Sequence, residues 1–213
     1  LLKGDALIGN LETVLGGPDR PYAGYPSFNT PDALADALDR AGFTALLLAN
    51  NHILDRGTDA ALRTARVLKE TGFAVTGLDA RSPDPLLLDV GGVRVGILNR
   101  TYGSNRPITP AMAERATPNV IDPVAMARDV MDLRGRGAQY LVAALHWGAE
   151  YRPLPDRSQR AAAFLCLAMG VDAVVGAHPH VLQPVEIHLE FGKPQFIAWS
   201  LGNFLSAQRT VPR

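Results

Sequence analysis

The sequence predicts an α/β fold, and three observations lead to this prediction. Short β-prone apolar runs alternate with stretches of helical periodicity along most of the 213 residues. The helical stretches begin at capping residues or proline and most end near glycine. His146, His178 and His180 stand where apolar runs stop, which is where open α/β folds bind ligands, beyond the carboxyl ends of their strands.

The first half of the chain predicts three strands separated by two helices. The strands are expected at residues 5–10, 43–49 and 73–76. A helix is expected over residues 30–42, since its threonine, proline and aspartate form a start signal and a glycine ends it. Residues 58–72 predict a second helix, because alanine and leucine recur there at helical spacing before a terminal glycine.

The second half predicts two hairpins with two helix–strand units between them. In order, the expected elements are strands 86–90 and 93–98, helix 122–133, strand 140–145, helix 158–170, strand 173–175, and strands 185–189 and 195–199. Gly91-Gly92 is a strong turn signal for the first hairpin. Residues 102–118 have little periodicity and predict a long functional loop.

Composition narrows the class of protein. Twenty-one basic residues balance 21 acidic ones, so no overall field attracts a nucleic acid. No apolar run approaches the roughly 20 residues of a membrane span, and no secretory signal opens the chain. We expect one domain over residues 1–213, in the cytoplasm or associated with the cell envelope, with its oligomeric state open. Cys166 lies in an apolar helical stretch and is expected in the core.

Polar residues gather just beyond the predicted strands. Imidazole nitrogens combined with carboxylate or amide oxygens suit a borderline divalent ion such as zinc, manganese or iron, whereas calcium prefers oxygen ligands almost exclusively. Such an ion acidifies a bound water and polarises a phosphoryl or carbonyl oxygen. The sequence therefore predicts metal-assisted chemistry with one or two ions.

Six short motifs resemble, in order and spacing, those of the CapA-like poly-gamma-glutamate capsule synthesis proteins. They are Asn10-Leu11-Glu12, residues 50–57, residues 101–105, residues 146–151, Gly176-Ala177-His178-Pro179-His180 and residues 200–204. That family is similar to the calcineurin-like metallophosphoesterases, so the resemblance implies a four-layered α/β sandwich with a metal centre at the sheet edge. Relatives usually begin with a strand that ends in Gly-Asp and supplies an aspartate ligand. Asp5 lies too close to the first motif to be this aspartate, so we expect a domain lacking its first strand and incomplete at both ends.

The resemblance also implies a role for each motif residue. The implied metal ligands are Glu12, Asn51, His146, His178 and His180, for manganese, zinc, iron or magnesium. His52 is implied as a catalytic proton donor or electrostatic stabiliser, and Asp55 as the group that orients it. The residues implied to support the ligands or contact substrate are Asn10, Arg56, Tyr102, Asn105, Glu150, Tyr151 and Asn203.

Each of these residues also has a structural interpretation. The histidines could be hydrogen-bonded groups near a sheet edge. Asn50 and Asn51 could cap a turn or helix. Glu12 could be an exposed acid after a strand. The coincidence of three histidines at strand ends favours the metal site.

Three functions remain open from the sequence. The first is a metal-dependent enzyme that acts on a peptide-like or polyglutamate-like substrate, by hydrolysis or transfer at a phosphoryl or acyl centre. The second is a metal-dependent peptide epimerase that removes an α-proton. The third is a non-catalytic component of envelope polymer synthesis or export, whose site binds an anionic chain.

Overall fold

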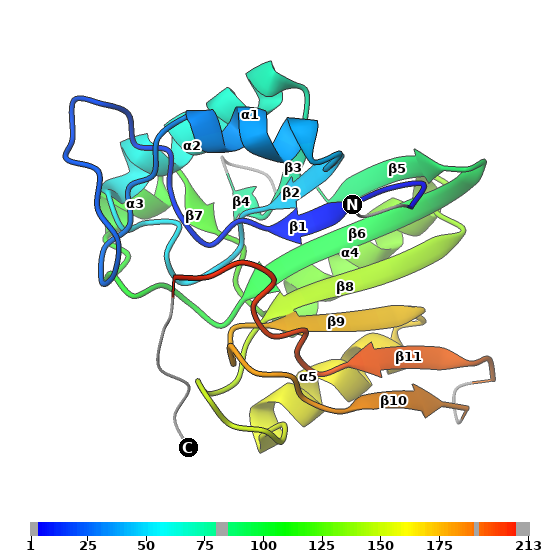
Figure 1. The fold of residues 1–213 in the computed structure, drawn as a ribbon. Coiled ribbons are helices and arrows are strands. Elements are labelled where there is room, and N and C mark those ends of the chain that lie inside the picture. The colour runs from blue at the N-terminus through cyan, green and yellow to red at the C-terminus, as the bar shows by residue number, and fades with distance from the viewer. Residues whose placement is uncertain (1–3, 80–84, 190–191, 208–213) are drawn as a thin grey trace.

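The computed structural model describes residues 4–79, 85–189 and 192–207, and its strands and helices follow the alternation predicted from the sequence (Figure 1). In chain order the elements are β1 (Ile8–Asn10), α1 (Ala33–Arg40), β2 (Ala45–Leu47), α2 (Gly57–Thr71), β3 (Ala74–Thr76), β4 (Leu78–Asp79), β5 (Leu86–Val90), β6 (Val93–Thr101), α3 (Pro110–Ala113), β7 (Thr117–Pro118), α4 (Pro123–Gly135), β8 (Tyr140–His146), α5 (Arg157–Ala168), β9 (Ala173–Ala177), β10 (Val185–His188) and β11 (Gln195–Ala198).

The strands form two main sheets. The small sheet has the order β1-β2-β3 and is parallel throughout. The large sheet has the order β10-β11-β9-β8-β6-β5, in which β6, β8, β9 and β11 are parallel and the two edge strands are antiparallel to their neighbours. Strands β4 and β7 form a separate antiparallel pair. The carboxyl ends of four parallel strands therefore share one edge of the large sheet.

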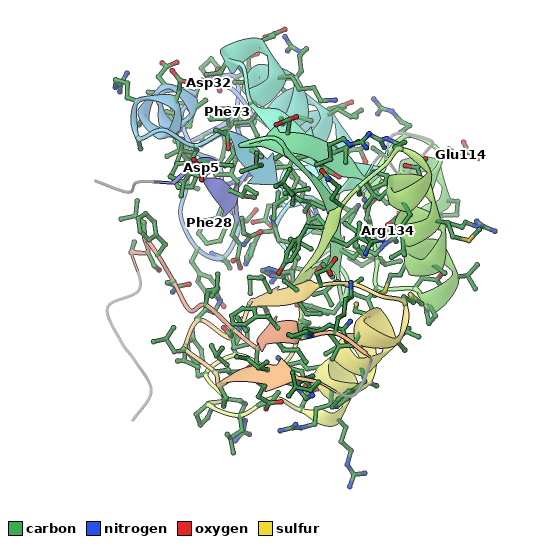
Figure 2. The ribbon with its side chains drawn as sticks, turned by 90° about the vertical axis from the view of Figure 1, so that its right-hand side faces the viewer. Asp5, Phe28, Asp32, Phe73, Glu114 and Arg134 are labelled. Atoms are coloured by element: carbon green, nitrogen blue, oxygen red, sulfur yellow. The ribbon has the colours of Figure 1, made fainter. Side chains whose placement is uncertain are left out.

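Three apolar clusters separate four layers, as the predicted sandwich requires. Helices α1 and α2 pack on one face of the small sheet through residues such as Leu46 and Leu68. Leu47, next to Leu46 on β2, points to the opposite face and meets Ile97 of the large sheet. Helices α4 and α5 cover the far face of the large sheet, in a cluster that contains Cys166. Figure 2 shows these two helices beside the large sheet and the other two over the small one.

Local signals explain where several elements begin and end. Asp156 caps α5 in a capping box with Gln159, and Gly72 ends α2 with a φ of 112°. Gly91 and Gly92 have φ values of 59° and 84°, as a two-residue hairpin turn requires. Cys166 is fully buried, which confirms its predicted place in the core, and this burial raises the pKa of the thiol to about 12.

Tertiary pairing extends two elements beyond their sequence signals. Strand β6 continues to Thr101 because it pairs with β8 up to that residue. Within it, the side-chain amide of Asn99 accepts a hydrogen bond from Ala49 N and donates one to Ala144 O. The predicted loop 102–118 contains the short helix α3, capped by the Thr109 side chain, and strand β7.

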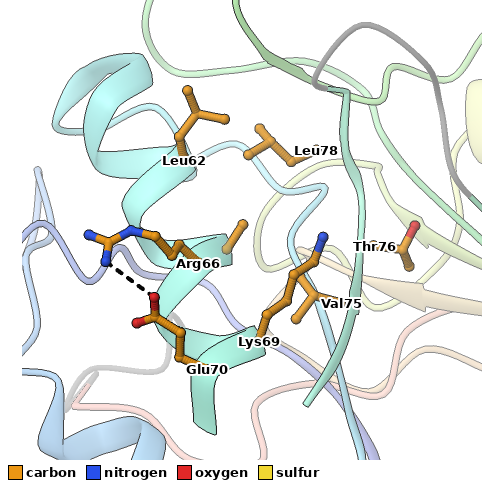
Figure 3. A pocket seen from close by; sticks show the side chains of 8 residues that line it. Leu62, Arg66, Lys69, Glu70, Val75, Thr76 and Leu78 are labelled. Atoms are coloured by element: carbon orange, nitrogen blue, oxygen red, sulfur yellow. Dashed lines mark hydrogen bonds and ion pairs between the residues drawn. The ribbon is translucent and has the colours of Figure 1, made fainter. Parts of the chain in front are cut away.

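A hollow of about 450 Å³ lies between α2 and strands β3 and β4 (Figure 3). Its apolar walls include Leu62, Val75 and Leu78, and the Arg66–Glu70 ion pair lies at its margin. None of the motif residues lines it. Among the described residues, no helix combines the length and apolar character needed to cross a bilayer.

Candidate metal centre

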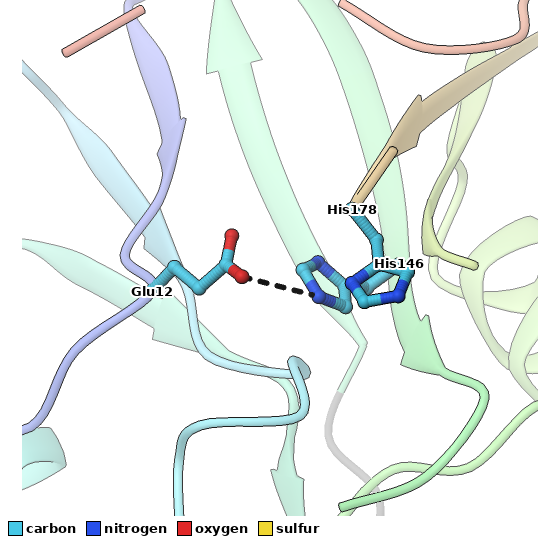
Figure 4. A group of neighbouring side chains, drawn as sticks. All are labelled: Glu12, His146 and His178. Carbon is cyan, nitrogen blue, oxygen red and sulfur yellow. Dashed lines mark ion pairs between the residues drawn. The ribbon is translucent and has the colours of Figure 1, made fainter. Parts of the chain in front are cut away.

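The carboxyl ends of strands from both sheets bring the motif side chains together. His146 is the last residue of β8, and His178 directly follows β9. Glu12 follows β1 of the small sheet and faces these two imidazoles across the gap between the strand ends (Figure 4). The prediction that the histidines lie at strand ends is confirmed.

Main-chain hydrogen bonds join the loops that carry these residues. Tyr102 N donates to His146 O at 2.9 Å, and Asn105 N donates to Asn51 O at 2.9 Å. Tyr151 N donates to Pro179 O at 2.8 Å. The polar loops therefore support one another, and their side chains are positioned by the sheets beneath them.

Two of the other predicted ligands, Asn51 and Glu12, converge on His146. Its Nε2 atom lies 2.8 Å from Asn51 Oδ1 and 3.7 Å from Glu12 Oε1. Glu12 Oε1 also lies 4.0 Å from His180 Nε2. Ligand atoms roughly 2.1 Å from an ion lie about 3 to 3.5 Å from one another. These separations fit donors around a cation after small side-chain movements.

Two overlapping sets of side chains could hold an ion. One is Glu12, His146 and His178, and the other is Glu150, His178 and His180, each with ligand atoms within 4.8 Å of one another. Each set includes His178, and one imidazole nitrogen binds one ion. When His178 binds an ion with one set, the other two side chains of the second set are available to a second ion at a neighbouring position. The geometry brings Glu150 into the donor set, whereas the sequence placed it among supporting or substrate-contacting residues.

Burial keeps the imidazoles in the form that binds metals. Burial, followed by the neighbouring histidines, lowers the pKa of His146 well below its usual value and that of His178 to about 4. Within the described part of the chain, Nδ1 of both rings is buried without a hydrogen-bond partner. Most buried polar atoms in proteins have a hydrogen-bond partner, so two neighbouring imidazoles that each have an unpaired nitrogen point to a function beyond packing. Neutral, under-bonded imidazoles beside a carboxylate suit a divalent cation.

Unfavourable backbone conformations concentrate at this site. Tyr151, His178 and His180 have φ values of 60°, 97° and 59°, and they are the non-glycine residues with positive φ in the described chain. Such conformations cost free energy and persist where surrounding structure imposes them, often at functional sites. The loops after β8 and β9 thus hold these side chains in place at the expense of local stability.

His52 and Asp55 form a buried pair beside the metal ligands. His52 Nδ1 lies 2.8 Å from Asp55 Oδ2, and the same oxygen accepts a hydrogen bond from Phe28 N at 2.8 Å. Asn105 Nδ2 lies 3.3 Å from His52 Nε2. Because Asp55 accepts from Nδ1, the second ring nitrogen is directed to the open side of the site.

The two adjacent asparagines have different roles. Asn50 Oδ1 accepts from His52 N, and its amide donates to Leu11 O, so Asn50 is the residue that stabilises the turn. Asn51 instead directs Oδ1 to His146 and donates to Asn105 Oδ1.

The remaining predicted residues surround the ligands. Asn203 Oδ1 lies 2.9 Å from His180 Nδ1, and Asn10 donates to Glu12 Oε2 at 3.3 Å. The ring of Tyr102 lies 4.8 Å from that of His178 between centroids. Arg56 lies apart from the ligands, since its guanidinium donates to the main-chain oxygens of Ser27 and Phe28, and this geometry supports a structural role.

Sequence reasoning missed a hollow of about 540 Å³ next to this centre. It is lined by Tyr25, Pro26, Ser27, His52, Asp55, Asn105, Arg106 and Glu150. Arg106 directly follows the motif at residues 101–105 and lies in the loop predicted to be functional. Tyr25 to Ser27 lie in an irregular stretch between β1 and α1, which contains no recognised motif.

A model of the bacterial capsule synthesis protein family PGA_cap matches residues 1–208. The chain belongs to this family. It is 33% identical over 180 residues to the capsule biosynthesis protein CapA of Bacillus anthracis, covering 81% of this chain and 42% of that protein. It is 31% identical over 172 residues to the PGA biosynthesis protein CapA of Bacillus subtilis, covering 78% and 43%. The chain thus spans less than half the length of these relatives.

Solved structures agree with the predicted fold. The sulfate thiohydrolase SoxB of Thermus thermophilus matches with a TM-score of 0.54 at 17% identity, covering 80% of this chain and 30% of that one. The calcineurin-like phosphoesterase YfkN of Bacillus subtilis matches with a TM-score of 0.50 at 16% identity, covering 78% and 57%. The PGA_cap chain therefore has the α/β sandwich of the metallophosphoesterase type.

Proposed function

We propose that this PGA_cap chain is a metal-dependent enzyme that acts on a peptide-like or polyglutamate-like substrate, by hydrolysis or transfer at a phosphoryl or acyl centre. The observation that carries the proposal is the convergence of Glu12, Asn51 and His146 with a second pair of histidines at the strand ends. The capsule and PGA biosynthesis named for its relatives supports an anionic, glutamate-type polymer as substrate.

The donor atoms fit one or two divalent ions. Glu12, Asn51, His146 and His178 would hold the first, and His180 with Glu150 would contribute to a second. A bound ion would polarise the oxygen of the scissile group and lower the pKa of a coordinated water. Nitrogen and oxygen donors without thiolate favour manganese, zinc or iron over calcium.

The protein's own groups would complete the reaction. Asp55 would stabilise the imidazolium form of His52, so that Nε2 could deliver a proton to the leaving group. In the resting state Nε2 faces Asn105 at 3.3 Å, and that amide would move aside or turn its oxygen to the ring. Tyr102 packs against His178 and would limit the access of water from that side.

Metal content and turnover of a glutamate oligomer in deuterated water would test the proposal. The wild-type protein should retain at least one divalent ion after repletion and dialysis, and His146→Ala and Glu12→Gln should lose it. Mass spectrometry would separate cleavage from deuterium incorporation at the α-carbon. Deuterium incorporation without cleavage would show that the reaction is epimerisation and not hydrolysis. A wild-type protein that binds no metal would refute both enzymatic functions. If His52→Ala and His146→Ala retained full biological activity, a non-catalytic polymer-binding role would be correct.

A further inference from the structure

The hollow beside the metal centre has the size and chemistry of a substrate site. Its volume of about 540 Å³ falls within the range of small-molecule sites. His52, the proposed proton donor, and Glu150, a candidate ligand, both line it. A group bound there would therefore be adjacent to the reacting bond, on the side where the leaving group receives its proton.

Arg106 provides a cation in this hollow that is fixed in position. Its Nη1 atom donates to the main-chain oxygen of Asp55 at 2.9 Å, and its main-chain N donates to Ser104 Oγ at 3.2 Å. The preceding residue, Asn105, is tied to Asn51 O. These bonds hold the guanidinium at the rim of the site by one of its nitrogens.

The charge of Arg106 is not balanced by an ion pair. Among the described residues, no carboxylate lies within 4.0 Å of its guanidinium. Asp55 accepts from Arg106 through its main-chain oxygen, whereas its carboxylate is engaged by His52 and Phe28 N. Two of the three guanidinium nitrogens thus make no hydrogen bond to a described residue, and paired nitrogens of this kind match the geometry of an oxyanion.

Neighbouring arginines do not share this property. Arg56 donates to two main-chain oxygens of the loop at Ser27 and Phe28, and Arg20 donates to Arg56 O. Both stabilise the loops that form the wall of the hollow. Arg106 alone among these three lines the hollow.

We propose that Arg106 binds a carboxylate of the substrate next to the scissile bond and so selects an anionic, glutamate-type chain. This inference rests on the proposed function, because it uses the same site. Glu150 lines the same hollow and would repel an anion, but an ion bound by Glu150 and the histidines would neutralise that charge. The carboxylate would then lie between two positive groups.

Binding of an oligo-γ-glutamate to the manganese-loaded protein, measured by calorimetry, would test the inference. Arg106→Gln should weaken binding on the order of tenfold, as expected for loss of a charge-assisted hydrogen bond. The same oligomer with its α-carboxylates converted to amides should bind the wild type and Arg106→Gln equally. Arg128→Ala removes one positive charge from α4, away from the hollow, and should leave binding unchanged.

Several outcomes would overturn the assignment. The first is that Arg106→Gln binds the carboxylate oligomer as tightly as the wild type does. The second is that Arg106→Gln binds both oligomers more weakly than the wild type, by the same factor. The third is that the wild type binds neither oligomer. If inorganic phosphate, but not the carboxylate oligomer, lost affinity in Arg106→Gln, the subsite would bind phosphoryl groups instead. Metal content and turnover of the same preparations separate the two proposals, since a metal-loaded, active Arg106→Gln with wild-type affinity would refute only the role of Arg106.

Discussion

Asp55 places a carboxylate directly against His52 Nδ1. Its Oδ2 atom accepts from both His52 Nδ1 and Phe28 N at 2.8 Å. In Asp55→Asn an amide oxygen could retain both hydrogen bonds, but the imidazolium form of His52 would lose its counter-charge. We expect turnover to fall roughly 10- to 100-fold with unchanged metal content.

A double-mutant cycle would check this dependence. If Asp55 acts through His52, then Asp55→Asn should cause little further loss of turnover in a His52→Ala background. A loss of similar size in both backgrounds would mean that Asp55 supports the loop and not the imidazole. Metal analysis of all four proteins would separate either result from a damaged ion site.

The buried imidazole of His178 makes the metal-free protein sensitive to acid. Its pKa is lowered from 6.5 to about 4, mainly by burial, so the unfolded chain binds more protons than the folded protein between these values. The contribution of this residue to stability is therefore fully present above about pH 6.5 and falls as the pH decreases toward 4. At pH 5 the preferential protonation of this residue in the unfolded chain should lower the free energy of unfolding by on the order of 2 kcal/mol relative to its value above pH 6.5.

Denaturant unfolding in the presence of a chelator would measure this effect at pH 7 and pH 5. His178→Asn is a suitable comparison, since asparagine tolerates the positive φ of this position and does not titrate in this range. The loss of stability between the two pH values should be smaller in this variant. An equal loss in both proteins would assign the acid sensitivity to other groups.

At the scale of elements, β9 and the segment after β11 approach closely at Gly176. A Cβ atom at this position would collide with the carbonyl oxygen of Trp199 and would lie 2.5 Å from Trp147 Nε1. The two tryptophans are buried and joined by a 3.0 Å hydrogen bond from Trp147 Nε1 to Trp199 O, so neither can move easily. Gly176→Ala should therefore destabilise the protein by about 1 to 3 kcal/mol and reduce metal affinity through displacement of His178.

Gly135→Ala offers a matched control for this substitution. Gly135 ends α4, has no positive φ, and leaves open space where a Cβ atom would be added. Thermal unfolding of the two variants should show a large decrease for Gly176→Ala and none for Gly135→Ala, where alanine favours the helix. A decrease of similar size in both would contradict the role of close strand approach.

Periodicity was sufficient to predict the buried strands β8 and β9 to within two residues at each end. Residues 140–145 and 173–175 are largely apolar and lie within Tyr140–His146 and Ala173–Ala177, since both strands lie inside the sheet with helices on one face. The extension of β6 to Thr101 could not be predicted, because polar residues there are satisfied by partners distant in sequence. Helix α3 escaped prediction because its four residues are too few for periodicity.

For the whole molecule, the site could be predicted only as far as residues lie in recognised motifs. The position of His146 and His178 follows from strand ends, which apolar runs indicate directly. The different roles of Asn50 and Asn51 do not follow from sequence, because both fit a turn and only tertiary contacts separate them. The role of Arg106 does not follow from sequence either, because its guanidinium is positioned by the main-chain oxygen of Asp55, which lies 51 residues earlier in the chain.

Because the donor set combines side chains from both sheets, ion binding should stabilise the whole fold. The unfolded chain brings none of these distant residues together, so a bound ion adds a free energy of unfolding that grows with its concentration. At 100 times the dissociation constant the gain should be about 2.7 kcal/mol. Chemical unfolding at increasing manganese concentration would show this as a rising midpoint with a constant m-value.

Glu12→Gln and His146→Ala, which change one donor from each sheet, should each abolish most of the rise in the midpoint, whereas Arg128→Ala should preserve it. An equal rise in all four proteins would place the stabilising ion elsewhere, because the proposed ligands would then contribute nothing to its binding.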